Sequence, residues 1–229
     1  NTPFNIEHAP LIKLVCIRAS QGRHYLIQTF NHILFDGWSV GILNAELMKD
    51  YRTLMSGKPV SVTPLTFEPF PEYLLNTFDR EGAQAFWGGY LEGAPLNQRL
   101  PFSSEKPIDT FVEKRMKGIG GQLTQAQTSK LYQFAETSGY TPNQITQLAW
   151  CATLAEVLNT EDICIGTTMS DRPAEIDNVE SLFGLFVASP VLRVKGIKNK
   201  SVGKHLDDIA LSQLDRQQYA FHELNHYDE

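Results

Sequence analysis

An extended apolar run leads into a tight corner and then into a long amphipathic segment, and this order constrains the fold more than any other feature. The run covers residues 25–30, and the helix-like pattern begins at Ser39. The corner between them holds His32, Asp36 and Gly37. Corners between regular elements are where a rigid scaffold presents reactive groups. The sequence therefore predicts a strand–corner–helix unit with a candidate site at the corner.

The polar residues of this corner differ in what they can do chemically. The imidazole of His32 is the only side chain there that transfers protons readily near neutral pH. Asp36 can fix the corner by accepting backbone N–H groups or by pairing with an arginine. Gly37 is the residue most free to adopt a positive φ. A histidine four residues before an aspartate also occurs as a structural residue, so the spacing alone leaves both roles open.

The wider string resembles a known motif. Residues 31–39 read Asn-His-x-x-x-Asp-Gly-Trp-Ser, similar to the His-His-x-x-x-Asp-Gly signature of nonribosomal peptide synthetase condensation domains. These belong to the chloramphenicol acetyltransferase-like acyltransferases. Asn31 stands where the family has its first histidine. The resemblance implies an α/β, two-lobed chloramphenicol acetyltransferase-like fold. It places the motif-bearing remainder of the N-terminal lobe at 1–100 and a C-terminal lobe, truncated at its end, at 101–229.

Later segments resemble the family in the expected order. Residues 165–173 resemble its strand and arginine-proline turn, and residues 183–193 its Gly-x-Phe-Val-Asn-Thr strand, with Ala188 where asparagine is usual. Residues 217–223 are similar to its His-Gln-x-x-Pro-Phe-Glu segment, and residues 67–73 loosely match an aromatic motif. Each later motif is weak alone, but four motifs in the right order are strong.

The resemblance also implies roles for single residues. His32 would be the catalytic base or positioning acceptor when an amide bond forms between acyl groups carried as thioesters on donor and acceptor carrier proteins. Asp36 would hold the loop through an ion pair with Arg172 of the other lobe. No permanently bound cofactor or metal is expected, because the substrates arrive on phosphopantetheine arms. Proximity and a well-placed base suffice for a thioester, which is already reactive.

Two alternatives stay open. Asn31 and Ala188 favour a catalytically degenerate docking module that binds carrier proteins or tailoring enzymes, whereas His32, Asp36 and Gly37 oppose it. A freestanding acyltransferase that uses coenzyme A would share the histidine and aspartate, but the later motifs favour the synthetase. The resemblance also implies that the N-terminal lobe is incomplete, so a second chain or segment is expected to complete it.

Composition excludes several classes of protein. The net charge of −6 and the pI near 5.5 do not predict a nucleic-acid-binding surface. The sequence shows no apolar run long enough for a membrane span and no signal peptide, so a cytoplasmic location is expected. Cys16, Cys151 and Cys164 lie in apolar segments without Cys-x-x-Cys spacing, and they are expected to be buried free thiols.

Periodicity and cap residues predict the remaining elements. We expect a hairpin of strands 11–19 and 24–32, and further strands at 111–123, 162–168 and 182–194. Pro190 predicts a bulge or an edge position in the last of these. The expected helices are 39–55, 70–78, 81–91, 125–138, one opened by Thr141, and 202–219.

Overall fold

The computed structural model describes residues 4–61, 66–102 and 120–224, and within them the chain forms two compact units. The first unit combines residues 1–78 with 169–188, and the second combines 79–168 with 189–229. The first unit is therefore discontinuous in sequence. The lobes predicted at 1–100 and 101–229 stay a prediction.

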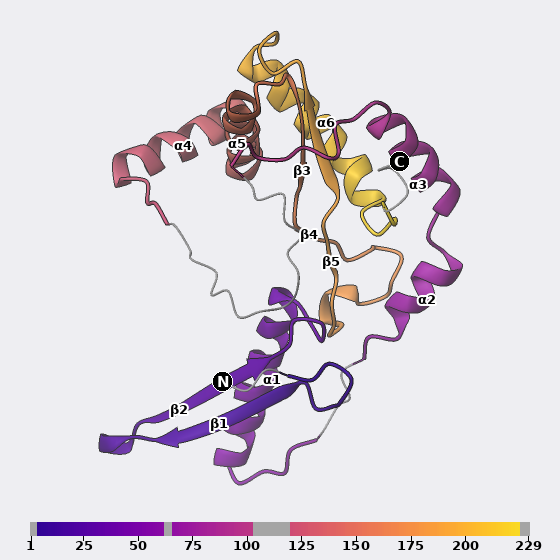
Figure 1. The fold of residues 1–229 in the computed structure, drawn as a ribbon. Helices are drawn as coiled ribbons and strands as arrows, with labels where there is room; N and C mark the ends of the chain where they lie inside the picture. Colours follow the sequence, from indigo (N-terminus) through magenta and orange to yellow (C-terminus); the bar gives the residue numbers. More distant parts are fainter. Residues whose placement is uncertain (1–3, 62–65, 103–119, 225–229) are drawn as a thin grey trace. The chain divides into compact units, whose positions relative to one another are not determined.

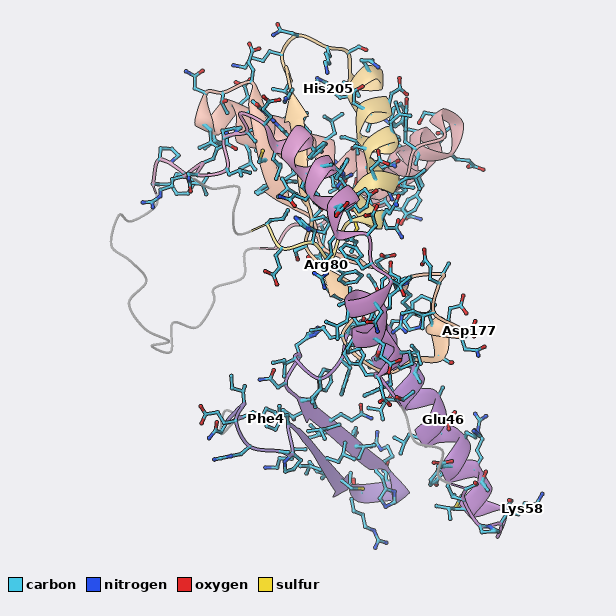
Figure 2. The ribbon with its side chains drawn as sticks, turned by 90° about the vertical axis from the view of Figure 1, so that its right-hand side faces the viewer. Phe4, Glu46, Lys58, Arg80, Asp177 and His205 are labelled. Atoms are coloured by element: carbon cyan, nitrogen blue, oxygen red, sulfur yellow. The ribbon has the colours of Figure 1, made fainter. Side chains whose placement is uncertain are left out.

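The first unit is built on a hairpin followed by a long helix (Figure 1). Strands β1 and β2 pair antiparallel, from Ile12 opposite Phe30 to Arg18 opposite His24. The bounds in this unit are β1 Ile12–Arg18, β2 His24–Phe30, α1 Gly37–Met55, α2 Pro69–Asn76, β4 Met169–Ser170 and β5 Val187–Ala188. β4 and β5 pair antiparallel, and the short 3-10 helix Val179–Ser181 lies between them in sequence. Figure 2 labels Glu46 within α1 and Lys58 just beyond its end.

The second unit packs helices around a two-stranded antiparallel ladder. Its elements are α3 Arg80–Leu91, α4 Gln125–Ser138, α5 Pro142–Leu158, β3 Asp162–Gly166, β6 Val191–Lys195 and α6 Val202–Gln218. Buried residues of α5, both strands and α6 form its core, including Cys151, Ile163, Leu192 and Leu206. Both predicted capping boxes are present, with Thr124 and Thr141 each accepting from the backbone N–H three residues later. These caps explain why the starts of α4 and α5 were predictable.

The predicted strand over 182–194 is wrong as a single element. β5 and β6 are separate strands that pair with different partners, β4 and β3 respectively. Ser189 and Pro190 separate them, and a proline has no N–H with which to continue a ladder. The strand expected over 111–123 lies outside the described residues up to residue 119, and residues 120–123 form no strand.

The cysteines only partly follow the prediction. Cys151 is buried, and burial raises the pKa of its thiol to about 12, while that of the half-buried Cys164 is raised to about 11. Cys16 is exposed on β1, so the expectation that it is buried is wrong. Along the described parts of the chain, no helix combines the length and the apolar character that a membrane crossing requires.

Candidate functional site

The corner after β2 is a small loop closed at its base by aromatic rings. The Phe30 and Phe35 ring centroids lie 4.4 Å apart, and Phe35 is buried against Phe183 at 4.6 Å. The backbone N–H of Asn31 donates to the Leu11 carbonyl at 2.9 Å, which extends the hairpin by one bond. The ring contacts and this hydrogen bond therefore hold both ends of the loop in place.

His32 lies at the tip of this loop with an exposed side chain. Its ring meets the Phe30 ring edge-on, with centroids 6.4 Å apart. Among the residues that the structure describes, none forms a hydrogen bond or ion pair with the imidazole. The imidazole is therefore available to accept a proton or a hydrogen bond from a ligand.

Asp36, four residues further on, is 1% exposed, and its carboxylate is used to hold the fold together. Its Oδ1 caps α1 by accepting the Ser39 N–H at 2.9 Å, and its Oδ2 accepts the Phe186 N–H at 3.0 Å. Its own N–H donates to the Gly184 carbonyl at 3.1 Å. A buried carboxylate that accepts backbone N–H groups is well compensated. Asp36 thus ties the corner to the segment that leads into β5.

The predicted partner of Asp36 is also present. An Nη of Arg172 lies 3.7 Å from Asp36 Oδ1, and both side chains are buried. The guanidinium also donates to the Val179 and Leu182 carbonyls, and it lies 4.0 Å from the Phe186 ring centroid. Burial lowers the pKa of Arg172, and the charges of Asp36 and Glu180 oppose this shift. The expected ion pair is therefore present, and its two residues belong to the same compact unit.

Ser39 is a site residue whose contribution sequence reasoning missed. It is 0% exposed, and its Oγ donates to the Gly184 carbonyl at 2.9 Å and accepts the Gly184 N–H at 3.1 Å. The same oxygen lies 3.3 Å from an Arg172 Nη that donates to it. One signal in the sequence could have identified Ser39: it stands four residues before Leu43, on the apolar side of an amphipathic helix.

The two glycines of the site have different roles. Gly37 starts α1 with a helical backbone and open space where a Cβ would stand, so the corner does not use the positive φ that a glycine allows. Gly184 leaves no room for a Cβ, because the added atom would overlap the Phe67 ring. The close approach of Gly184 to Ser39 and Phe67 therefore requires glycine.

Taken as chemistry, the site holds one available proton acceptor and one anchored carboxylate. Where the structure describes the chain, no group of His, Cys, Asp and Glu side chains is arranged to hold a metal ion. The arrangement supports general-base or hydrogen-bond assistance by His32, while Asp36 and Arg172 hold the loop that presents it.

The sequence and the fold both match known proteins. A family model described as "Condensation domain" matches residues 1–229. Bacitracin synthase 3 of Bacillus licheniformis is 30% identical over 199 residues, which is 86% of this chain and 3% of that protein. Such long relatives carry the matching region as a small part of their length.

Two solved structures show the likeness of fold. The first condensation domain of the calcium-dependent antibiotic synthetase, in complex with substrate analogue 2a, superposes with a TM-score of 0.69 at 18% identity. The X-domain from teicoplanin biosynthesis gives 0.73, also at 18% identity. Each match covers 95% of this chain and 49% or 50% of the other, so the chain spans about half of these domains. On the family match along its whole length, the chain belongs to the condensation-domain family of nonribosomal peptide synthetases.

Proposed function

We propose that the protein of which this chain is part forms an amide bond between acyl groups carried as thioesters on a donor and an acceptor carrier protein. The observation that carries the proposal is the exposed His32 imidazole, held on a loop whose two ends are fixed. Membership of the condensation family supports the reaction class. The fold alone does not, because a condensation domain and an X-domain both match it.

In the proposed reaction the acceptor amine attacks the donor's thioester carbonyl. A C–N bond forms, the C–S bond breaks, and the phosphopantetheine thiol leaves. His32 Nε2 or Nδ1 accepts the proton that the attacking nitrogen loses, and this proton can then pass to the departing thiolate. No resident cofactor is needed, because the thioester is already activated. A positioned base of this kind contributes about 10²–10⁴-fold.

The test is single-turnover transfer between loaded carrier proteins, using the full-length protein and its His32→Ala variant. Transfer should fall by about 10²-fold or more while the melting temperature stays constant, because His32 is exposed and makes no bond that stabilises the fold. His24→Ala, an exposed histidine within β2, is the matched control and should transfer normally. Near-normal transfer by His32→Ala would remove His32 from the mechanism.

The docking-module alternative makes a different prediction for the same assay. If the parent protein binds both loaded carriers but transfers nothing, its role is recruitment. Asn31 and Ala188 support that alternative, since Ala188 is buried in β5 opposite Met169 and offers no side-chain hydrogen bond. The available imidazole of His32 supports catalysis instead.

We also propose that additional polypeptide, from the same chain or a second one, covers the β1–β2 hairpin and α1. Their exposed side chains include Leu14, Ile17, Tyr25, Ile27, Met48, Tyr51, Leu54 and Met55. So many exposed apolar side chains on neighbouring elements mark an interaction site. The solved domains with the same fold are about twice as long as this chain, which supports the proposal. The three free cysteines support a reducing compartment such as the cytoplasm.

A further inference from the structure

Asn31, which departs from the family motif, is used by the fold in a specific way. Its side-chain Oδ1 accepts the Ile33 N–H at 3.0 Å, and its carbonyl accepts the Leu34 N–H at 3.2 Å. These two bonds close a turn over residues 31–34. His32 is the residue that both bonds span, so its backbone direction depends on them.

The chain builds the same turn a second time, away from the site. Asn5 Oδ1 accepts the Glu7 N–H at 3.0 Å, and the Asn5 carbonyl accepts the His8 N–H at 3.1 Å. The donors stand at the same offsets, two and three residues after each asparagine. The bonding at Asn31 is therefore a recurring turn structure, and Asn5 provides a matched reference.

We propose that Asn31 is a positioning residue for His32: its amide oxygen closes the turn that aims the imidazole. This inference rests on the proposed function of His32 and deepens it. The base of the loop is held by the Phe30 and Phe35 rings, but the tip is held by the turn bonds. An amide oxygen accepts at every pH at which a histidine titrates, so the turn keeps its acceptor whether His32 is charged or neutral. The asparagine is thus a functional replacement rather than a lost catalytic group.

The first measurement is hydrogen exchange at the Ile33 amide in the full-length protein. Asn31→Ala removes the acceptor, so exchange at Ile33 should quicken by about 2- to 10-fold, the usual net effect of one hydrogen bond. Asn31→Asp keeps an oxygen at the same position, so it should restore protection. Unchanged exchange in Asn31→Ala would show that the bond does not form and would overturn the proposal.

The second measurement is single-turnover transfer with the same variants. Asn31→Ala should slow the transfer step by about 2- to 10-fold with the carrier affinities unchanged, and Asn31→Asp should recover most of the rate. Asn5→Ala breaks the equivalent turn elsewhere and should transfer normally. If His32→Ala abolishes transfer but Asn31→Ala does not slow it, positioning is refuted and the proposed function stands. If His32→Ala transfers normally, the proposed function itself fails.

Discussion

At the scale of single residues, His32 and Asp36 are four positions apart and have opposite environments. His32 is exposed and makes no polar bond to the described residues, whereas Asp36 is 1% exposed and accepts two backbone N–H groups. His32 is therefore available to a ligand, whereas the carboxylate of Asp36 is already occupied by bonds within the fold. Substitutions at the two positions should therefore separate chemistry from stability.

Asp36→Ala should destabilise the protein by about 3–5 kcal/mol, because it leaves the buried Arg172 without its counter-charge and the Ser39 and Phe186 N–H groups without an acceptor. Urea unfolding of parent and variant measures the difference. Glu46→Ala, which breaks the exposed pair between Glu46 and Lys49, is the control and should cost less than about 1 kcal/mol. Equal effects of the two substitutions would show that Asp36 has no special structural role.

Asn31→His should retain or raise transfer, since it restores the family's pair of histidines. A neutral imidazole at position 31 can still accept the Ile33 N–H through one ring nitrogen, but a protonated one cannot. The gain should therefore appear above about pH 7 and vanish below about pH 6. Transfer rates across this range measure it. If the parent and the variant are both inactive at every pH, Asn31 is not the cause, and Ala188 becomes the next residue to change.

At the scale of elements, local signals in the sequence predicted the helices but not the long-range contacts. The capping residues Thr124 and Thr141 predicted the starts of α4 and α5, because a capping box depends only on residues close together in the sequence. The Asp36–Arg172 pair was predictable only through the family resemblance. The bonds of Ser39 to Gly184 join residues 145 positions apart. Helical spacing could place Ser39 on the apolar side of α1, but it could not identify Gly184 as its partner. The break between β5 and β6 was missed in part because each pairs with a different strand, β4 and β3, that lies elsewhere in the sequence.

The segment that carries Gly184 should be sensitive to added volume. Gly184→Ala would force the new methyl group against the Phe67 ring and should destabilise the protein by about 1–3 kcal/mol. Gly41→Ala is the control, because Gly41 lies inside α1 with open space around it and should gain up to about 1 kcal/mol from helix propensity. Thermal unfolding of both variants gives the comparison. A stable Gly184→Ala variant would refute the tight approach at this segment.

At the scale of the whole molecule, the exposed hairpin is the surface that most needs explaining. Its side chains stand on both faces of a two-stranded sheet (Figure 2), and a hairpin alone is marginally stable in water. Covering polypeptide would remove this surface from water and would supply the strength that two strands lack. Cys16 lies within β1 and reports directly on whether that happens.

Thiol labelling at pH 8 should therefore distinguish the chain alone from the longer protein. In the 229-residue chain, Cys16 should react rapidly, while Cys151 and Cys164 should react slowly because raised pKa values of about 12 and 11 leave little thiolate. In the full-length protein Cys16 should become protected as well. Equal labelling of Cys16 in both would contradict the proposed cover over the hairpin.

The discontinuity of the first unit has a consequence for how the protein is made. Phe186, whose N–H satisfies Asp36, lies 150 residues later in the chain. A ribosome adding about 5–20 residues per second needs roughly 8–30 s to synthesise that interval. Throughout this time the corner that carries His32 exists without the segment that secures it, and water must solvate the Asp36 carboxylate. The nascent chain can secure the loop that carries His32 only after most of the second unit has been translated.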